Sequence, residues 1–387
     1  SLRAYRFEGD ILETLPADVV AIRSEDVERA TAMAEQLVAR SLRERTQAAA
    51  LTTPAISELL RFNRAEGLAA GMAGRARLRG ALWGDARARY GFGDQRWKGE
   101  FGLSVALPDG QAMRLFVRDD LRERRGVAEV SGVRNSLAAG LFGTDLSDPY
   151  RARTAGLELN FGRYAGVRLR ALAEVETHAQ PTAAVTRDVP PLLPVAEGAA
   201  RSITVIADGI QRRPFGGLLL GSGRAMVFER DARGLRVDVQ AEYTRSFAQG
   251  GLLLRSTASG VSAGRIAPQY LPVLGGPITT PGYGSYPWVA RRAITQRVEW
   301  QREIPFVSVP LGRYGAIPGR ATIAPFVHVL WADGTAGLRG ARQGWHPAVG
   351  IGLEPFLGML RFDVARGLRD GRWTFGVDVM RGWWPIL

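Results

Sequence analysis

Apolar and polar side chains alternate along much of the chain. From Leu235 to Thr244 every second residue is apolar, and the residues between them are polar. Neighbouring side chains of a β-strand point to opposite sides, so this period of two predicts a strand with one apolar and one polar face. The same alternation recurs over residues 82–90, 98–105, 167–176, 360–365 and 372–379. The pattern therefore predicts an all-β chain in which charged faces recur from strand to strand.

The number and spacing of these segments indicate how the charged faces are used. About fifteen segments follow Arg61, and they begin roughly twenty residues apart. Strands of soluble sandwiches recur every 8–12 residues or so, and the longer spacing is typical of long hairpins. In a membrane barrel the apolar faces meet lipid and the charged faces line the interior. We therefore predict a transmembrane antiparallel β-barrel. The alternative is a large soluble β protein such as a propeller or a double sandwich, although no repeat of about 40–50 residues is visible.

The N-terminal part of the chain has a different pattern. Ser24 can cap a helix whose first turn carries Glu25 and Asp26, and apolar residues then recur at helical spacing. We expect residues 1–60 to form a periplasmic segment with this short helix. Residues 61–387 are expected to form the barrel. An amphipathic helix that lies on the membrane is the alternative for the first segment.

The chain is strongly basic, with 51 Lys and Arg residues against 38 Asp and Glu residues and a net charge of +13. Nucleic-acid-binding proteins gather such charge on one face or in runs, whereas Arg is spread here beside Asp and Glu. We therefore expect no nucleic-acid partner. The chain contains no cysteine, which excludes disulfides, thiolate metal sites and cysteine nucleophiles.

Catalytic chemistry has little support in the sequence. Gly260–Gly264 reads GVSAG, which fits the nucleophile elbow with Ser262 as the nucleophile. That motif needs a strand, a sharp turn and a helix, and a Pro-rich stretch follows here instead. The three histidines do not have the spacing of a metal motif. We expect no catalytic residue, no metal and no cofactor, with an outer-membrane phospholipase as the alternative.

Two stretches of the chain resemble a known family. In VGIGLEPFLGMLRFDVARGL, residues 349–368, a glycine-rich strand precedes a strand that carries Asp and then Ala-Arg. RFNRAEGLAAG, residues 61–71, is similar to an opening barrel strand. Both resemble the outer-membrane assembly and secretion barrels, the superfamily that includes BamA, TamA and the two-partner secretion transporters. The resemblance implies about sixteen strands. The last five are expected at 292–301, 321–331, 347–354, 359–366 and 372–380.

The longest uncharged run, residues 266–290, contains five prolines and four glycines, so it predicts a loop and not a transmembrane helix. The resemblance implies that this loop folds into the barrel, with Gly282 and Tyr283 at its tip. Family members carry an aliphatic residue and an Arg before this pair, whereas this chain has Thr280 and Pro281. An ordinary surface loop is the alternative.

The resemblance also implies which residues of the inner wall face this loop. The candidates are Glu299, His328, Asp363 and Arg366. His328 stands where the family has the Asp of its Phe-x-Asp motif. The loop Arg and its Asp partner are thus both replaced, which is coherent because a lone buried carboxylate is costly.

By resemblance, the expected location is the bacterial outer membrane, in contact with its lipid and lipopolysaccharide. The expected activity is insertion or translocation of polypeptides, with a weak seam between residues 61–71 and 372–380. Expected partners are an unfolded outer-membrane or secreted client and periplasmic or outer-membrane accessory subunits. The alternative is a passive channel or a structural subunit without assembly activity, which the replaced loop Arg favours.

Overall fold

The computed structural model describes residues 49–51, 55–143, 145–182, 192–212, 214–248, 250–283, 288–310, 316–317, 319–333, 343–356, 358–369 and 372–379. The contacts of the chain divide it into two units, Ser1–Ala50 and Leu51–Leu387, and the long strands belong to the second. The helix expected from Ser24 onward lies outside the described residues. No helix of the described part is both long and apolar enough to cross a membrane.

Most of the described chain is β-strand. The strands are β1 (Ala49–Leu51), β2 (Leu60–Asn63), β3 (Gly67–Arg79), β4 (Leu82–Gly91), β5 (Arg96–Ala106), β6 (Ala112–Glu123), β7 (Pro149–Tyr164), β8 (Val167–Ala179), β9 (Gly198–Arg212), β10 (Leu218–Glu229), β11 (Arg233–Phe247), β12 (Gly250–Ala263), β13 (Val273–Leu274), β14 (Trp288–Val289), β15 (Arg292–Pro305), β16 (Val309–Pro310), β17 (Ala316–Ile317), β18 (Arg320–Asp333), β19 (Gly344–Pro355), β20 (Leu360–Gly367) and β21 (Trp373–Val379). The helices are α2 (Ile56–Leu59) and α3 (Gly132–Phe142), and the 3-10 turns are η1 (Pro108–Gly110), η2 (Pro214–Gly216) and η3 (Pro268–Tyr270).

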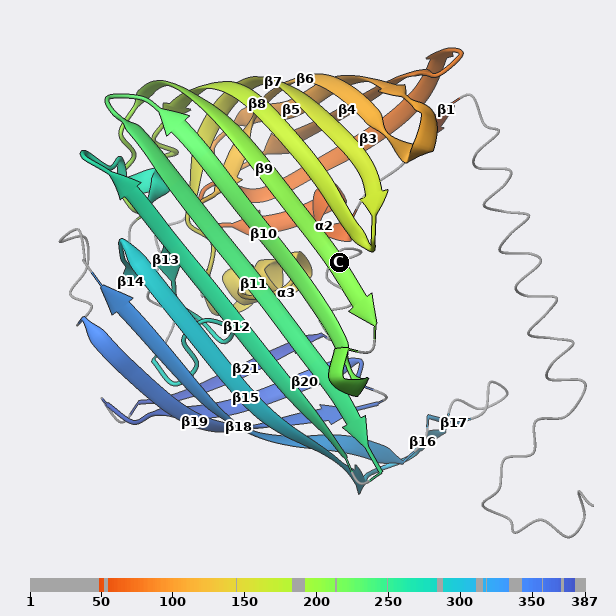
Figure 1. Ribbon diagram of the computed structural model, residues 1–387, viewed down its shortest axis with the longest axis vertical. Coiled ribbons are helices and arrows are strands. Elements are labelled where there is room, and N and C mark those ends of the chain that lie inside the picture. Colours follow the sequence, from red (N-terminus) through yellow and green to blue (C-terminus); the bar gives the residue numbers. More distant parts are fainter. Residues whose placement is uncertain are drawn as a thin grey trace, which may run out of the picture. The chain divides into compact units, whose positions relative to one another are not determined.

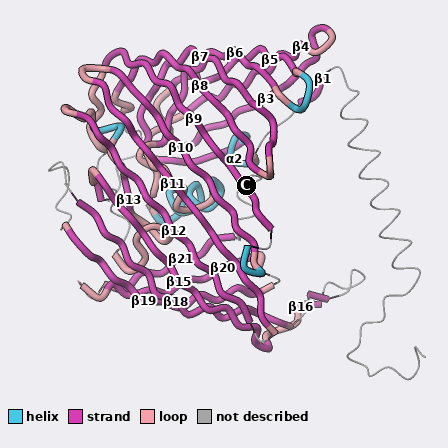
Figure 2. The backbone as a smooth tube through the Cα atoms, in the orientation of Figure 1, coloured by secondary structure: helices cyan, strands magenta, loops and turns pink. Residues whose placement is uncertain are grey.

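One 17-stranded sheet contains every described strand except β13, β14, β16 and β17. Apart from β1, its sixteen strands follow the order of the chain from β2 to β21, each antiparallel to the next. Figure 1 shows these strands curving around a common interior, and Figure 2 shows that the helices and loops occupy little of the trace. The predicted all-β antiparallel barrel fold of about sixteen strands is confirmed.

The five strands expected after the long loop are present as β15, β18, β19, β20 and β21. The prediction of a single opening strand over residues 61–71 is wrong, because this stretch forms the β2–β3 hairpin. Asn63 turns the chain by accepting hydrogen bonds at Oδ1 from the amides of Ala65 and Glu66, both at 2.9 Å. Gly67 follows with φ of 65°, a left-handed conformation that favours glycine.

The two faces of the sheet are opposite in character to those of a soluble protein. On β11, Val237 and Val239 are 37% and 46% exposed, while Arg236 and Asp238 are 4% and 7% exposed. The same exposed apolar face includes Leu115, Val117, Val175, Ile203, Val227, Ile294, Val298, Val327, Val349 and Ile351. Buried charged residues of the other face include Arg89, Lys98, Glu174, Glu176, Arg255, Arg297 and Glu299. The outer face is thus apolar and the inner face charged, which is the arrangement of a barrel that meets lipid on the outside.

Neighbouring strands are antiparallel, so every second connection lies at the same end of the sheet. The long connections 124–148, between β6 and β7, and 264–291, between β12 and β15, share one end, which we call the loop end. Short turns such as 80–81 lie at the opposite end. The longest stretches available to fill the interior therefore enter it from the same side.

The first and last strands of this series are the edges of the sheet. β2 pairs with β3 and β21 pairs with β20, but no pairing joins β2 to β21 among the described residues. We call the gap between β2 and β21 the seam. Its two edges keep backbone groups that the ladder does not use.

Candidate functional site

A cluster of charged residues projects from β15, β19 and β20 into the interior. Glu299 accepts from Arg361 Nη2 at 2.7 Å and lies 2.7 Å from Arg297 Nη2. Asp363 accepts hydrogen bonds from Arg361 Nε at 2.8 Å and from Arg297 Nη2 at 3.2 Å. Glu354 also forms an ion pair with Arg361. We call these five residues the wall cluster. Each arginine of the cluster contacts more than one carboxylate, so the buried charges compensate one another.

We call the connection between β12 and β15, residues 264–291, the inner loop, and its described residues fill the loop end of the interior. Glu129 holds its middle: the carboxylate accepts from the amides of Ile278 at 2.9 Å and Thr279 at 3.1 Å, and from the Thr279 hydroxyl. Arg125 adds a hydrogen bond to the carbonyl of Gly275 at 2.7 Å. Burial raises the pKa of Glu129 above its ordinary value.

The tip of the inner loop contacts the last strands of the sheet. The amide of Gly282 donates to Thr374 Oγ1 at 2.8 Å, and its carbonyl accepts from the amide of Gly367 at 3.0 Å. Gly282 has φ of 84°, and an added Cβ would collide with the backbone of Gly367. The Tyr283 hydroxyl donates to the carbonyl of Pro347. The close approach of residue 282 to the backbone of Gly367 therefore requires glycine at this position.

The beginning of the inner loop contacts the opposite part of the sheet. Tyr270 stacks on Phe228 of β10 with ring centroids 4.0 Å apart. Gln269 Nε2 lies 2.9 Å from Nδ1 of His178 on β8. The loop therefore touches strands from β8 to β21, and its contacts cross the interior.

Two of the four wall residues proposed from the sequence meet in one network. Glu299 and Asp363 both bind Arg297 and Arg361. His328 is 1% exposed and lies opposite Arg297 on the neighbouring strand, and neither of its ring nitrogens has a hydrogen-bond partner among the described residues.

Arg366 is placed differently from the expectation. It lies on the outer face of β20, exposed, with its guanidinium 5.5 Å from the ring centre of Trp373. Asp363 and Arg366 differ by three positions along the strand, an odd number, so a strand must direct them to opposite faces. The assignment of Arg366 to the inner wall is therefore corrected.

The sequence did not indicate the partners that complete the site. Arg361 lies in the alternating segment 360–365, but its contact with Glu299 joins positions 62 residues apart. Glu129 and Thr279 are 150 residues apart, and no local pattern marks such a pair. Arg361 and Asp363 stand at alternate positions of one strand and therefore share a face. This was the one sequence signal that pointed to the wall cluster.

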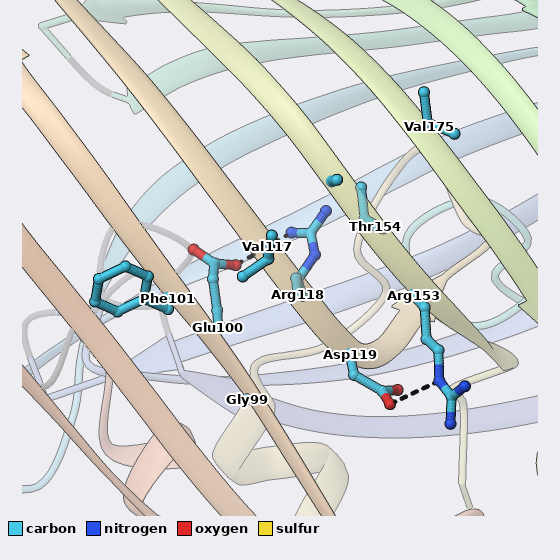
Figure 3. Close-up of a pocket in the computed structure, with 10 residues that line it drawn as sticks. Gly99, Glu100, Phe101, Val117, Arg118, Asp119, Arg153, Thr154 and Val175 are labelled. Carbon is cyan, nitrogen blue, oxygen red and sulfur yellow. Dashed lines mark hydrogen bonds and ion pairs between the residues drawn. The ribbon is translucent and has the colours of Figure 1, made fainter.

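A shallow hollow of about 660 Å³ lies on the wall over β5 to β8 (Figure 3). Phe101 and Val117 are exposed there, beside the ion pair between Asp119 and Arg153 at 3.0 Å. Glu100 alternates with Phe101 along β5 and faces inward, where it contacts Arg118 at 3.5 Å. The hollow belongs to the open outer wall and does not enclose a site. The residues around the hollow illustrate the two faces of the sheet, with Phe101 and Val117 on the apolar outer face and Glu100 and Arg118 on the charged inner face.

A second cavity, of about 450 Å³, lies beside the inner loop. Its apolar lining comes from Leu218, Leu220 and Leu253 of the wall and Ile278 of the loop. Residues 374–379 of β21 also line it, so the cavity reaches the edge strand at the seam. No cluster of His, Asp and Glu suited to a metal ion occurs in the described part of the chain.

Comparison with known proteins gives a structural likeness only. No family model and no curated protein matches the sequence. The structure of BamA from Haemophilus ducreyi lacking POTRA domains 1–3 aligns with a TM-score of 0.52 and 11% identity, over 89% of this chain and 78% of that one. CdiB from Acinetobacter baumannii aligns with a TM-score of 0.43 and 13% identity, over 82% of this chain and 57% of that one. The chain therefore shares its fold with the barrel of this BamA structure.

Proposed function

We propose that this chain is a non-enzymatic barrel of the bacterial outer membrane that inserts or translocates polypeptides through its seam. The observation that carries the proposal is that, among the described residues, no strand pairs with the outer edge of β2 or of β21. A closed barrel without a mobile seam has no such edges. An extended client segment can hydrogen-bond to them as an added strand.

The exposed apolar face supports the membrane location. Apolar side chains such as Val239 and Val298 are exposed on strand after strand. Together they form a larger apolar surface than a water-facing sheet carries. Outer-membrane lipid and lipopolysaccharide are the partners that this face fits. In this proposal residues 1–60 are the periplasmic segment and 61–387 the barrel.

The filled interior supports passage at the seam over passage along the barrel axis. The inner loop crosses the loop end of the interior, and Tyr270, Leu274 and Tyr283 are each less than a tenth exposed. The 450 Å³ cavity beside β21 gives the side chains of an incoming segment an apolar place next to the edge. The proposed partners are an unfolded client and periplasmic or outer-membrane accessory subunits.

A passive channel or structural subunit is the second candidate. The observation that favours it is the wall cluster. The loop tip has Pro281 where the resemblance implies an Arg, and the arginines that pair with Glu299 are Arg297 and Arg361 of the wall. In the described part of the chain, Gly282 and Tyr283 hold the tip through hydrogen bonds to Thr374 and Pro347, and no ion pair links the tip to the wall.

Reconstitution separates the two candidates. Vesicles containing the purified chain are mixed with a urea-denatured small outer-membrane barrel, and the folded client is measured by its heat-modifiable gel mobility. We expect client folding to be faster than in empty vesicles of the same lipid. Ion conductance without any acceleration of client folding would replace the proposal with the passive channel.

The inner loop gives a prediction of its own. In the cysteine-free chain, Tyr283→Cys is expected to react with a membrane-impermeant maleimide on whole cells more than about tenfold slower than Arg265→Cys, because a buried thiol is reached only when the loop opens. Arg265 is the matched control, since it is exposed and belongs to the same loop. Equal reaction rates at the two positions would show a surface loop and remove the inserted loop from the proposal.

A further inference from the structure

The connection between β6 and β7, residues 124–148, stands at the seam, and we call it the strap. Its helix α3 begins at Gly132, directly after Ser131, whose Oγ accepts from the amide of Arg134 at 3.1 Å and so caps the helix. The described residues of the strap contact both edge strands and the inner loop.

The start of α3 is fixed to the last strand. Asp378 of β21 accepts from the Ser131 amide at 3.1 Å and from the Ser131 hydroxyl at 3.0 Å. Arg134 Nε donates to the backbone carbonyl of Val377. The strap thus occupies a backbone acceptor of the edge strand, a group that strand pairing would otherwise use.

The end of the strap is fixed to the first hairpin. Arg64, in the turn between β2 and β3, donates its amide to Asp145 at 2.6 Å and its Nη2 to Asp148 at 3.2 Å. Asp145 in turn accepts from Asn135 of α3 at 2.9 Å. The helix also packs on β2, because a Cβ at Gly140 would meet the ring of Phe62 at 3.7 Å. A continuous set of contacts therefore runs from β21 through α3 to β2.

The two attachments differ in burial. Arg64 is 5% exposed and Asp148 is fully buried, whereas Arg134 and Asp378 are only partly buried. A partly hydrated set of hydrogen bonds breaks more easily than a buried charged pair that would lose its partner. The contacts with β21 are accordingly the ones that separate first. Glu129 and Arg125 of the same strap hold the inner loop, so movement at the seam reaches the loop as well.

We propose that the strap closes the seam by side-chain and helix contacts in place of strand pairing, and that it must leave β21 before a polypeptide can pass. The requirement for release rests on the proposed function. The closure of the seam by the strap does not rest on it and can be tested without any client.

The test of closure is a pair of spin-label distances in vesicles. One pair joins Leu137→Cys on α3 to Phe375→Cys on β21, and the other joins Leu137→Cys to Met72→Cys on β3; all three side chains are exposed. The double variant Asp378→Asn, Arg134→Ala is expected to lengthen and broaden the first distance and leave the second unchanged. Glu303→Gln, which removes one side of an exposed ion pair with Arg320, is the matched control and should change neither.

Two results would overturn the closure. An unchanged first distance in the double variant would show that these contacts do not hold the seam. A change in both distances would show that α3 has lost its structure, so that no strap has been released from β21.

The test of release uses a reversible lock. Ser131→Cys and Asp378→Cys place thiols where the two side chains already touch. Client insertion is expected to be at least tenfold lower with the oxidised chain than with the reduced chain, and to recover when the disulfide is reduced. Equal insertion by both forms would overturn the requirement for release. If neither the locked nor the native chain inserts a client, the proposed function fails, while the distance measurements still decide whether the strap closes the seam.

Discussion

Replacing Glu299 with alanine is expected to destabilise the folded chain by about 3–5 kcal/mol. Glu299 is 1% exposed and accepts from both Arg297 and Arg361. Its removal leaves the buried guanidinium of Arg297 and the partly buried one of Arg361 to share Asp363 and Glu354, and uncompensated buried charge is the costly outcome. The measurement is a urea titration of the chain folded in lipid vesicles.

The same strand provides the control. Glu303 lies on β15 and pairs with Arg320 at 3.5 Å, but the two side chains are 71% and 74% exposed. Glu303→Ala should therefore change the free energy of unfolding by about 0–1 kcal/mol. Equal effects of Glu299→Ala and Glu303→Ala would mean that the wall cluster is as hydrated as the surface, and the inner face would lose its structural role.

The second large effect is expected from a charge on the outer face. Val239→Arg should cost roughly 2–4 kcal/mol if Val239 lies near the middle of the membrane, and Gln240→Arg should cost far less. The two residues are neighbours on β11, and only Val239 belongs to its apolar face. Folding yield and urea stability in vesicles measure both variants under identical conditions.

Similar tolerance of the two arginines would contradict the assignment of the faces. Tolerance at Val239 together with loss at Gln240 would reverse it, with the apolar face directed inward. The comparison is sharp because the variants differ by one position along the strand and introduce the same side chain.

The strands were predictable because their signal is local. Alternation at Leu235 to Thr244 requires only that a strand have two faces, and β11 covers that stretch completely. The last five strands were expected from the resemblance, and alternation supported those at 360–365 and 372–379. The turn at Asn63 to Gly67 was missed because the resemblance to an opening strand outweighed an Asn and a Gly that favour a turn.

The candidate site was predictable only where strand parity decides it. Glu299 and Asp363 were placed on the inner wall, but the parity that directs Asp363 inward also directs Arg366 outward, and this consequence was overlooked. The arginine partners of Glu299 and the anchor of the inner loop at Glu129 depend on how distant strands curve toward each other. Such contacts are set by the closure of the sheet and leave no trace in a short stretch of sequence.

The most direct test of the central claim, that the apolar outer face meets lipid, is a quenching scan along β11. Single cysteines at positions from Leu235 to Gln240 are introduced into the cysteine-free chain, labelled with a fluorophore and folded into vesicles that contain lipids with a spin label on the acyl chain. The account predicts strong quenching at Leu235, Val237 and Val239 and weak quenching at Arg236, Asp238 and Gln240. Quenching without this period of two, or fluorophores that all respond to a water-soluble quencher instead, would contradict it.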